Sequence, residues 1–457
     1  MRQCNDPSSH SAVVEEGTGI GAGAGAGSFE QCILFCFLVG GSFMPAGIVS
    51  TIALLAIIAL LIADPYRRPS VRIIPGAILF FMMLLAGLIG VSGNNPYNVA
   101  KDVWYVGNSA TILLFGYFLM ERIGSLQPVL RVFAISASVA ATVHIFRLAL
   151  HPSSLQSFLD IRTEVSAGYY ITALGLGIAY TAARYKLYLF NSGYALWGTA
   201  LLCLASVTLS FSRTLWVAVM VVGFTALFVA GLRNVMRWAI LLGCMALITA
   251  ATSDIDVEGS APEEAITTFR GKIINSLQEL KVADYTTFEE VNMNWRGFES
   301  YCALQSYLSG STLERIVGKG FGTDIDIGFT MTLNDEEFDF IPILHNGYLY
   351  LLVKTGLIGL ASFLSFLFLS ICKGIKVLRV PDQEAQACGF LLIVSTLIIL
   401  ETTFVISGMF SKGGLSQTII LMGMLLGHAE SILQKESERL GEVADLSRCS
   451  TQPTIVT

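Results

Sequence analysis

Long apolar runs recur along nearly the whole chain, and they constrain its fold more than any other feature of the sequence. A helix that crosses a lipid bilayer needs about 17–25 apolar residues. Of the 457 residues 54% are hydrophobic and only 14% are charged, a balance that the core of a soluble protein cannot absorb. The sequence therefore predicts an all-α polytopic membrane protein. We expect about twelve transmembrane helices, over residues 29–43, 46–63, 74–92, 99–120, 129–150, 167–183, 194–211, 213–231, 236–252, 346–372, 386–407 and 413–430.

The cationic residues orient these helices. With the N-terminus on the cytoplasmic side, alternate loops and the C-terminal tail carry Arg67, Arg68, Arg72, Arg122, Arg184, Lys186, Arg233, Arg237, Lys373, Lys376, Arg379, Lys435 and Arg439. The positive-inside rule places that side in the cytoplasm. The first two runs are short, and Pro45 separates them, so they form either two spans or one broken hairpin.

This orientation divides the chain into five parts. Residues 1–28, with "GTGIGAGAGAGS", form a disordered cytoplasmic tail, and residues 431–457 form a second cytoplasmic tail. Helices occupy residues 29–252 and 346–430, and one long polar loop, residues 253–345, lies on the outer side. Inside that loop "PEEAITTFRGKIINSLQEL" and "MNWRGFESYCALQSYL" predict helices, and "GKGFGTDIDIGF" is interpreted as a glycine-rich loop.

Several classes of function are disfavoured by the sequence. The five histidines form no HxxxH or HExxH cluster, so we expect no metal site and no other cofactor. No block of basic residues suggests a nucleic acid partner. The stretch "GKGFGT" has no strand before it and no helix opening after it, so it is a weak match to a nucleotide-binding loop.

The positive-inside rule predicts few cations on the outer side, and the exceptions are Arg147, Arg162, Arg213 and Arg296, with Lys101 and Lys412 near outer ends. Arg213, in "SFSRTLW", begins a helix whose N-terminus faces outward, and the free N–H groups there add to its charge. Such a site suits a phosphate, although an arginine that snorkels to lipid headgroups has the same position. Arg296, in "NWRGFES", either contributes to an anion site or pairs on the surface with Glu299 at helical spacing.

His345 opens the apolar run "HNGYLYLLVKTGLIGL" on the outer side. The positive end of a helix disfavours imidazolium, and a neutral imidazole is what a general base requires. The alternative interpretation is a histidine that caps the helix or lies in the membrane interface.

These residues resemble the superfamily of O-antigen ligases and Wzy-type O-antigen polymerases, which are glycosyltransferases of the bacterial envelope. His345 and Gly356, with ten residues between them, are similar to the family's H-x10-G segment. The turn "SFSRTLWVAVMVVG" is similar to its Ser-Arg turn, with Val217 where R-x3-L usually ends. The long outer loop with Arg296 and "GKGFGT" also fits, as do the twelve spans, and the resemblance covers about residues 30–430.

The resemblance implies a GT-C-like enzyme of the bacterial inner membrane with a periplasmic active site and a metal-independent, inverting reaction. The donor is a glycan on undecaprenyl diphosphate, and the acceptor is a sugar hydroxyl on another lipid-linked glycan or on lipid A-core. Arg213 and Arg296 correspond to the arginines that grip the diphosphate, with Arg162 in "DIRTEVSAGYY" as a further candidate, and His345 to the residue that activates the acceptor. A flippase and a chain-length regulator are the implied protein partners. The analogy favours polymerase slightly over ligase.

Two other classes are compatible with many apolar helices. A lipid-linked glycan flippase or another transporter has the same general composition, although we detect no repeated half and few polar residues at mid-membrane. A structural subunit of a secretion complex is the third possibility.

Overall fold

The computed structural model describes residues 26–63, 77–152 without 92, 165–230 without 167, 279–341 without 286, 334 and 335, 343–410 and 415–450. Every predicted span within these ranges coincides with a helix. The helices are α1 (Ala26–Phe43), α2 (Ala46–Ala63), α3 (Ala77–Ile89), α4 (Pro96–Ile123), α5 (Leu126–Leu150), α7 (Tyr170–Tyr185), α8 (Gly193–Leu209), α9 (Arg213–Ala230), α15 (Gly347–Leu378), α16 (Gln383–Ile406) and α17 (Ser416–Ser450). The predicted span 236–252, most of the predicted helix in "PEEAITTFRGKIINSLQEL", and Arg162 lie outside the described residues.

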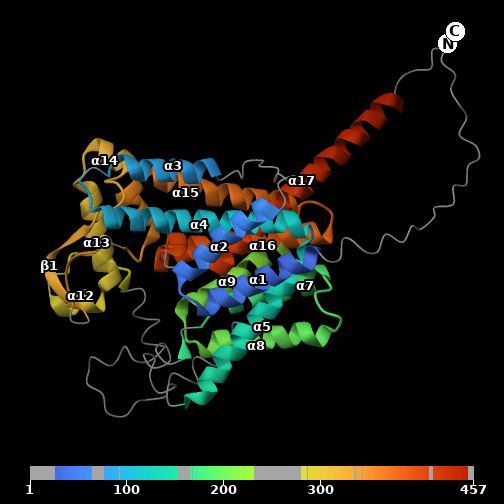
Figure 1. Cartoon of the computed structure of the whole chain (residues 1–457), viewed down its shortest axis with the longest axis horizontal. Coiled ribbons are helices and arrows are strands. Elements are labelled where there is room, and N and C mark those ends of the chain that lie inside the picture. Colours follow the sequence, from blue (N-terminus) through green and yellow to red (C-terminus); the bar gives the residue numbers. More distant parts are fainter. Residues whose placement is uncertain are drawn as a thin grey trace, which may run out of the picture.

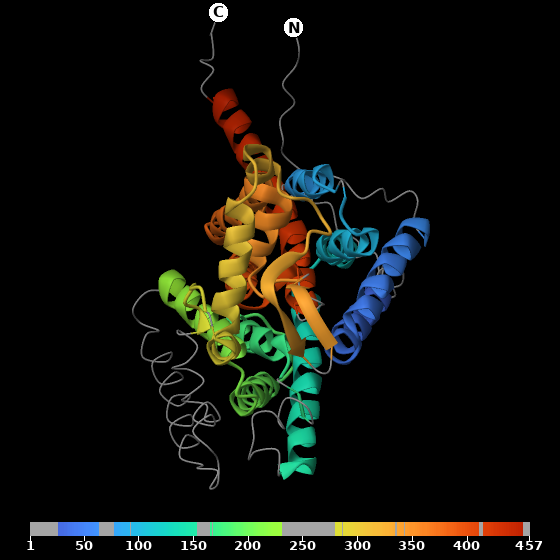
Figure 2. The same cartoon turned by 90° about the vertical axis from the view of Figure 1, so that its left-hand side faces the viewer.

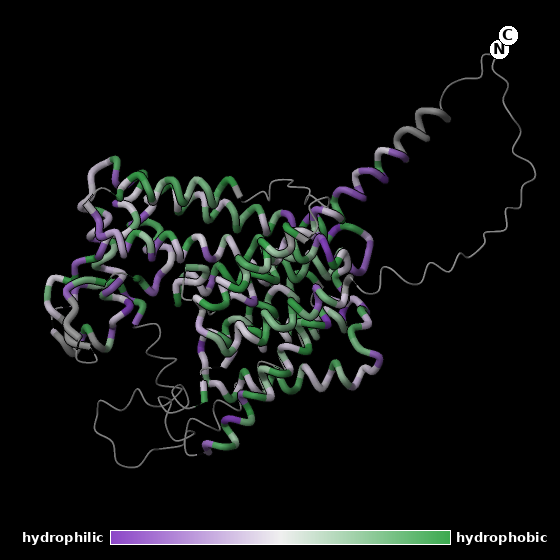
Figure 3. The backbone as a smooth tube through the Cα atoms, viewed as in Figure 1, coloured by the Kyte–Doolittle hydropathy of each residue, from purple (hydrophilic) through white to green (hydrophobic). Residues whose placement is uncertain are grey.

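The chain is a largely helical membrane protein. Within the described residues, α4, α5, α15 and α16 are each long and apolar enough to cross a bilayer, and five further apolar helices are shorter. Figure 3 shows hydrophobic residues along the helical bundle and hydrophilic residues gathered in the segments at its ends. The prediction of a helical membrane protein is therefore confirmed, whereas the number of spans stays a prediction.

The ends of α4 show how local sequence sets the helix limits. Asn95 caps the N-terminus by accepting a hydrogen bond from the backbone N–H of Tyr97, and Pro96 occupies the first turn, where its missing N–H has no consequence. Gly124 ends the helix in the left-handed conformation, with φ of 72°.

The elements of the long polar loop gather at one end of the bundle (Figures 1 and 2). They are α12 (Phe288–Met293), α13 (Trp295–Leu308), α14 (Thr312–Val317), β1 (Ile325–Leu333) and β2 (Glu336–Ile341). The two strands pair antiparallel, with Ile325 opposite Ile341. The C-terminal part of α17 projects from the other end of the bundle (Figure 1).

Two features differ from the predictions. The stretch interpreted as a glycine-rich loop continues into the β-hairpin, because Ile325 and Ile327 alternate with Asp326 and are buried on one face. Helix α17 runs to Ser450 and so continues through the predicted C-terminal tail. Apolar periodicity alone could not reveal that extension, because pairs such as Arg439–Glu436 (2.8 Å) support a solvated helix.

A kink in α15 allows the end of α14 to dock against it. Gly356 has φ of 63° and ψ of −163°, so the helix is interrupted there. The carbonyl groups of Val353 and Lys354 accept hydrogen bonds from the backbone N–H groups of Lys319 (2.8 Å) and Gly320 (3.1 Å). A Cβ atom on Gly356 would lie 2.4 Å from the backbone nitrogen of Gly318, so this close approach requires glycine.

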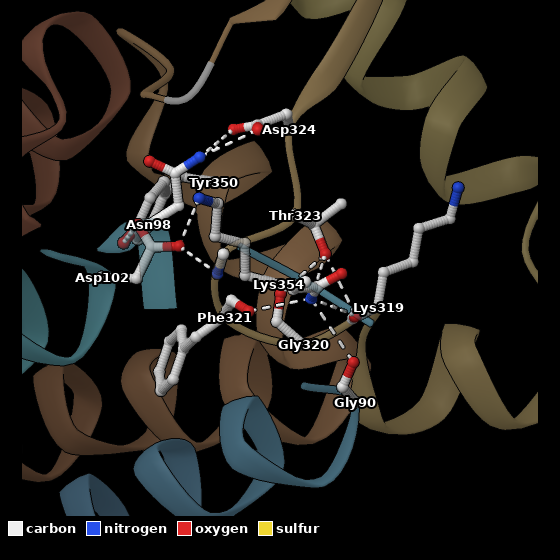
Figure 4. Close-up of polar contacts among 12 residues, drawn as sticks. Gly90, Asn98, Asp102, Lys319, Gly320, Phe321, Thr323, Asp324, Tyr350 and Lys354 are labelled. Atoms are coloured by element: carbon white, nitrogen blue, oxygen red, sulfur yellow. Dashed lines mark hydrogen bonds and ion pairs between the residues drawn. The ribbon is translucent and has the colours of Figure 1, made fainter. Parts of the chain in front are cut away.

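The segment after α14, residues 318–323, is here named the glycine loop, and it joins α4 to α15 (Figure 4). The buried carboxylate of Asp102 in α4 accepts hydrogen bonds from Lys354 Nζ, from Tyr350 Oη (2.8 Å) and from the backbone N–H of Gly322 (2.7 Å). Asn94 Nδ2 donates to the backbone oxygen of Phe321 (2.8 Å). The stretch "GKGFGT" therefore anchors the segment from α12 to β2 to α4 and α15.

Candidate functional site

A pocket of about 250 Å³ lies where α13 meets the start of α15 and the end of α16. It is lined by Leu280, Val282, Arg296, Glu299, Ser300, Leu304, His345, Asn346, Tyr348, Leu349, Phe404 and Val405. Arg296 and His345, which stand far apart in the sequence, thus share one cavity. The pocket is mainly apolar and includes a few polar groups, as is usual for sites that bind small molecules.

Glu299 orients the imidazole of His345. One carboxylate oxygen lies 2.9 Å from Nδ1 of His345, and the other accepts the backbone N–H of the same residue at 2.9 Å. The Glu299 side chain is only 2% exposed, whereas that of His345 is 49% exposed. Because the carboxylate can only accept, a neutral ring carries its hydrogen on Nδ1 and presents the lone pair of Nε2. That arrangement is the one used by an oriented general base.

The backbone at His345 is held from both sides. Asn346, rather than His345, caps α15, and its Oδ1 accepts the N–H groups of Tyr348 (3.0 Å) and Leu349 (3.2 Å). Ser407, after the end of α16, donates from its Oγ to the carbonyl of His345 (3.3 Å). The helix-capping interpretation of His345 is therefore wrong, and the ring is available for another purpose.

Arg213 and Arg296 converge on one carboxylate oxygen. Nη1 and Nη2 of Arg213, in the first turn of α9, each lie 3.4 Å from Oε2 of Glu279, and Nη1 of Arg296 lies 3.9 Å from the same atom. All three side chains are partly buried, with exposures of 22–26%. Two guanidinium groups around one oxygen define a position that favours an anion, and Glu279 supplies that anion from within the chain.

A glycine allows this convergence. A Cβ atom on Gly297 would lie 2.1 Å from the carbonyl oxygen of Lys281, so the segment containing Glu279 lies directly against the first turn of α13. Arg296 precedes Gly297 and is therefore brought beside Glu279. In "NWRGFES" Gly297 thus permits the close backbone contact, and Arg296 before it forms the ion pair with Glu279.

Cys302 and Asp324, which do not line the pocket, have other surroundings. Burial raises the pKa of the Cys302 thiol to about 11, with Asp284 and Asp326 contributing, so this thiol is a poor nucleophile at neutral pH. Asp324 accepts two hydrogen bonds from Asn98 Nδ2 (3.0 and 2.9 Å). Within the part of the chain that the structure describes, no three histidine, cysteine or acidic side chains form a group that could hold a metal ion.

The sequence analysis names Arg213, Arg296 and His345 as candidates but assigns no role at the site to the two carboxylates that contact them, Glu279 and Glu299. A spacing of three residues on one helix predicts that Glu299 is a surface partner of Arg296. In the structure both of its oxygens bind His345. No local signal in the sequence marks Glu279, which reaches Arg213 across 66 positions of the chain. Arg162 lies outside the described residues, so its proposed role stays a prediction.

The resemblance to O-antigen ligases and polymerases rests on the residues quoted above and not on the comparisons with known proteins. No protein-family model matches this chain, and no curated protein matches it significantly.

Proposed function

We propose that this chain is a membrane glycosyltransferase that moves a glycan from undecaprenyl diphosphate to a sugar hydroxyl. The observation that carries the proposal is the pocket in which His345, oriented by Glu299, stands beside Arg296. Arg296 shares the carboxylate of Glu279 with Arg213, so a base and a paired cationic group lie next to each other. An acid–base residue beside an anion site is what transfer from a diphosphate requires.

The reaction follows from these groups. The acceptor hydroxyl oxygen forms a bond to the anomeric carbon of the donor, while the bond from that carbon to the diphosphate oxygen breaks. The proton of the hydroxyl passes to Nε2 of His345, and the electron pair leaves with the diphosphate. Fixed guanidinium groups of Arg213 and Arg296 stabilise the charge that develops on the leaving group. Attack from the side opposite the leaving group inverts the anomeric configuration.

Glu279 occupies the anion position of the arginine pair in this structure. A diphosphate bound there competes with its carboxylate for the same guanidinium groups, because two anions at one position repel each other. Binding of the donor is therefore coupled to displacement of the Glu279 side chain.

The proposed membrane placement has twelve spans, cytoplasmic termini and a periplasmic site. Two features support it: α4 and α15 carry Arg122 and Lys376 in their last turns, away from the end that carries α12 to β2. The proposal favours polymerase over ligase on analogy alone. A flippase and a chain-length regulator are the expected protein partners.

A lipid-linked glycan transporter is the second candidate, and one observation favours it. The ion pair between Asp102 and Lys354 is almost completely buried between α4 and α15, and intramembrane ion pairs are frequent in transporters. Against this, the backbone N–H of Gly322 and the hydroxyl of Tyr350 also bind Asp102, which makes the pair part of a structural anchor.

Proteoliposomes that contain the purified protein and an undecaprenyl diphosphate-linked glycan separate these functions. Lengthening of the lipid-linked glycan with donor alone indicates a polymerase, and a product formed only after addition of lipid A-core indicates a ligase. Movement of the donor across the bilayer without any new glycosidic bond contradicts the proposal and supports the transporter.

We predict that the segment from α12 to β2, here named the outer segment, is accessible from outside the cytoplasmic membrane. In a variant without the nine native cysteines, Thr312→Cys, at an exposed position of α14, is expected to react with an impermeant thiol reagent in intact spheroplasts. Ser437→Cys, on the exposed part of α17, is the matched control and is expected to react only after lysis. The reverse pattern would invert the orientation and remove the proposed site from the periplasm.

We predict that Arg213→Lys and Arg296→Lys each weaken donor binding. Lysine keeps the charge but lacks the planar fork, so a loss of about 10–100-fold in affinity is expected for a charge-assisted contact. Glu279→Gln is expected to change affinity in the opposite direction, because it removes the competing anion. Binding of the purified variants to lipid-linked donor measures both effects.

Arg315→Lys is the matched control for these two variants, since Arg315 is an exposed arginine of α14 in the same outer segment. Wild-type donor affinity for Arg213→Lys would show that Arg213 only anchors the helix in the interface.

A further inference from the structure

A groove with a volume of about 340 Å³ lies between α5 and α8, at one edge of the bundle (Figures 1 and 2). It shares no lining residue with the pocket that holds His345. The hydroxyl groups of Ser138 and Thr142, which lie in the groove, donate to backbone carbonyl groups one turn earlier (2.9 and 2.8 Å). The rest of its wall is mainly apolar, with Ile135, Val139 and Val143 of α5, Phe190, and Ala195 and Thr199 of α8.

Arg131 stands at one end of this groove. It precedes Ile135 by four residues on α5, so the two side chains lie on the same face of the helix. Its Nε donates to the carbonyl group of Leu189 (2.6 Å), the residue before Phe190. That bond orients the planar guanidinium group and leaves its two Nη groups for a ligand. The Arg131 side chain is exposed, and no acidic side chain among the described residues pairs with it.

The segments that form this end of the groove are basic. Residues 126–143 and 184–200 contain Arg131, Arg184 and Lys186 but no aspartate or glutamate. All three cationic residues are exposed. Cations that are not balanced by nearby acids create a local potential that attracts anions. At a membrane surface such a potential favours lipids with a net negative charge.

Aromatic residues indicate the depth of this end in the membrane. Tyr188, Tyr194 and Trp197 are 79%, 90% and 64% exposed, as aromatic residues commonly are at the interface between headgroups and acyl chains. From Arg131 to Val143 the helix advances about 18 Å at 1.5 Å per residue, which is roughly the thickness of one leaflet of the hydrocarbon core. The groove therefore runs from the level of the headgroups along the acyl chains of one leaflet.

We propose that this groove binds a phospholipid with a net negative charge. Its phosphate lies on Arg131, where the two Nη groups match two phosphate oxygens, and one acyl chain lies between α5 and α8. Arg184 and Lys186 favour a lipid whose headgroup adds no positive charge of its own. The apolar wall between Ile135 and Val143 suits an acyl chain better than a sugar or a polar peptide.

This inference does not rest on the proposed glycosyltransferase activity. The groove lies between α5 and α8, whereas the proposed site is formed by α13, α15 and α16. Binding of a lipid can be measured whether or not the chain transfers a glycan, so failure of one proposal leaves the other unaffected.

Two lipid probes with identical acyl chains differ in the net charge of the headgroup. Phosphatidylglycerol is anionic, whereas phosphatidylcholine carries a positive charge that balances its phosphate. Native mass spectrometry of the full-length protein, released from detergent with each lipid in turn, gives the two affinities for the first bound lipid. Wild-type protein is expected to prefer phosphatidylglycerol by roughly tenfold, the effect of one charge-assisted contact.

Two variants assign the headgroup and the acyl chain to their contacts. Arg131→Gln is expected to lower the preference to roughly twofold, because the two remaining cations act only at longer range. Arg379→Gln is its matched control, since Arg379 is an exposed arginine just after α15, and it is expected to keep the wild-type preference. Ala195→Trp fills the groove and is expected to weaken binding of both lipids.

Leu201→Trp is the matched control for Ala195→Trp, because Leu201 is 65% exposed on α8 but does not line the groove. It is expected to leave both affinities unchanged. Melting temperature and monodispersity of each variant show that it is folded.

Four results would overturn the proposal. They are equal wild-type affinity for the two lipids, an undiminished preference in Arg131→Gln, the same loss of preference in Arg379→Gln, and unchanged binding in Ala195→Trp. A lipid-free dimer in the wild-type spectra that Ala195→Trp dissociates would assign the groove to a second copy of the chain instead.

Discussion

His345→Ala is expected to lower glycan transfer by about 10²–10⁴-fold, the usual effect of removing an acid–base residue. Donor binding is expected to stay close to wild type, because the arginine pair that we propose holds the diphosphate is unchanged. Parallel measurement of donor affinity and turnover on purified, monodisperse protein separates this result from misfolding, which would lower both. Wild-type turnover of His345→Ala would show that the base lies elsewhere.

Glu299 allows the role of His345 to be tested further. Glu299→Gln keeps the shape of the side chain but can present an N–H group to Nδ1, so the favoured tautomer is lost and turnover is expected to fall by less than in His345→Ala. If the two residues act as a unit, the double variant is no slower than His345→Ala alone. Additive losses would contradict the orienting role of Glu299.

His428→Ala is the matched control for this series. His428 also contacts a carboxylate, Glu384, at 3.4 Å, but Glu384 lies in the first turn of α16, whereas the pocket lies at the end of that helix. Replacement of His428 by alanine is therefore expected to leave turnover near wild type. A loss equal to that of His345→Ala would indicate a general effect of removing a histidine–carboxylate pair.

Breaking the buried pair between Asp102 and Lys354 is expected to have the largest effect on stability. Lys354→Met leaves the Asp102 carboxylate buried without its counter-charge, which typically costs about 3–5 kcal/mol. Asp102→Ala is expected to cost at least as much, since it also removes the acceptor for Tyr350 and Gly322. Unfolding of each variant by heat or denaturant, in the same detergent, measures the change in the free energy of unfolding.

The double variant Asp102→Asn/Lys354→Met provides the decisive comparison. It removes both charges but keeps one side-chain oxygen that can accept from Gly322 or Tyr350, so it is expected to be more stable than Lys354→Met. Lys319→Met, at a lysine of the glycine loop whose Nζ contacts Ser306 (3.1 Å), is the control and is expected to cost little. A double variant less stable than either single variant would contradict the ion-pair interpretation.

The apolar helices could be predicted from sequence because their signal is local. A run such as residues 386–407 is apolar over bilayer length whatever surrounds it, and α16 occupies Gln383–Ile406. Caps and breakers such as Pro96 and Gly124 add limits that are equally local. The β-hairpin was missed because a short strand has a weaker signal, which depends on a partner strand and on one buried face.

The site could be predicted only in part, because only some of its residues stand out from their local sequence. Arg213 and His345 are conspicuous because each stands at the start of a long apolar run. Glu299 and Glu279 are two of 34 acidic residues, and nothing nearby distinguishes them. The contact of Glu299 with His345 crosses 46 positions of the chain, so it exists only once α13 packs against the start of α15.

By itself the sequence determined that this is a helical membrane protein, where most of its helices lie, and which cations and histidine stand at their ends. These properties follow from the favourable transfer of apolar residues out of water. That free energy depends on the composition of each segment and not on the other segments. The tertiary structure alone decided that the glycine loop is an anchor, that Asp102 and Lys354 neutralise each other, and that Glu299 orients His345. The reason is that a buried polar group is stable only beside its partner, and folding brings that partner from a distant part of the chain.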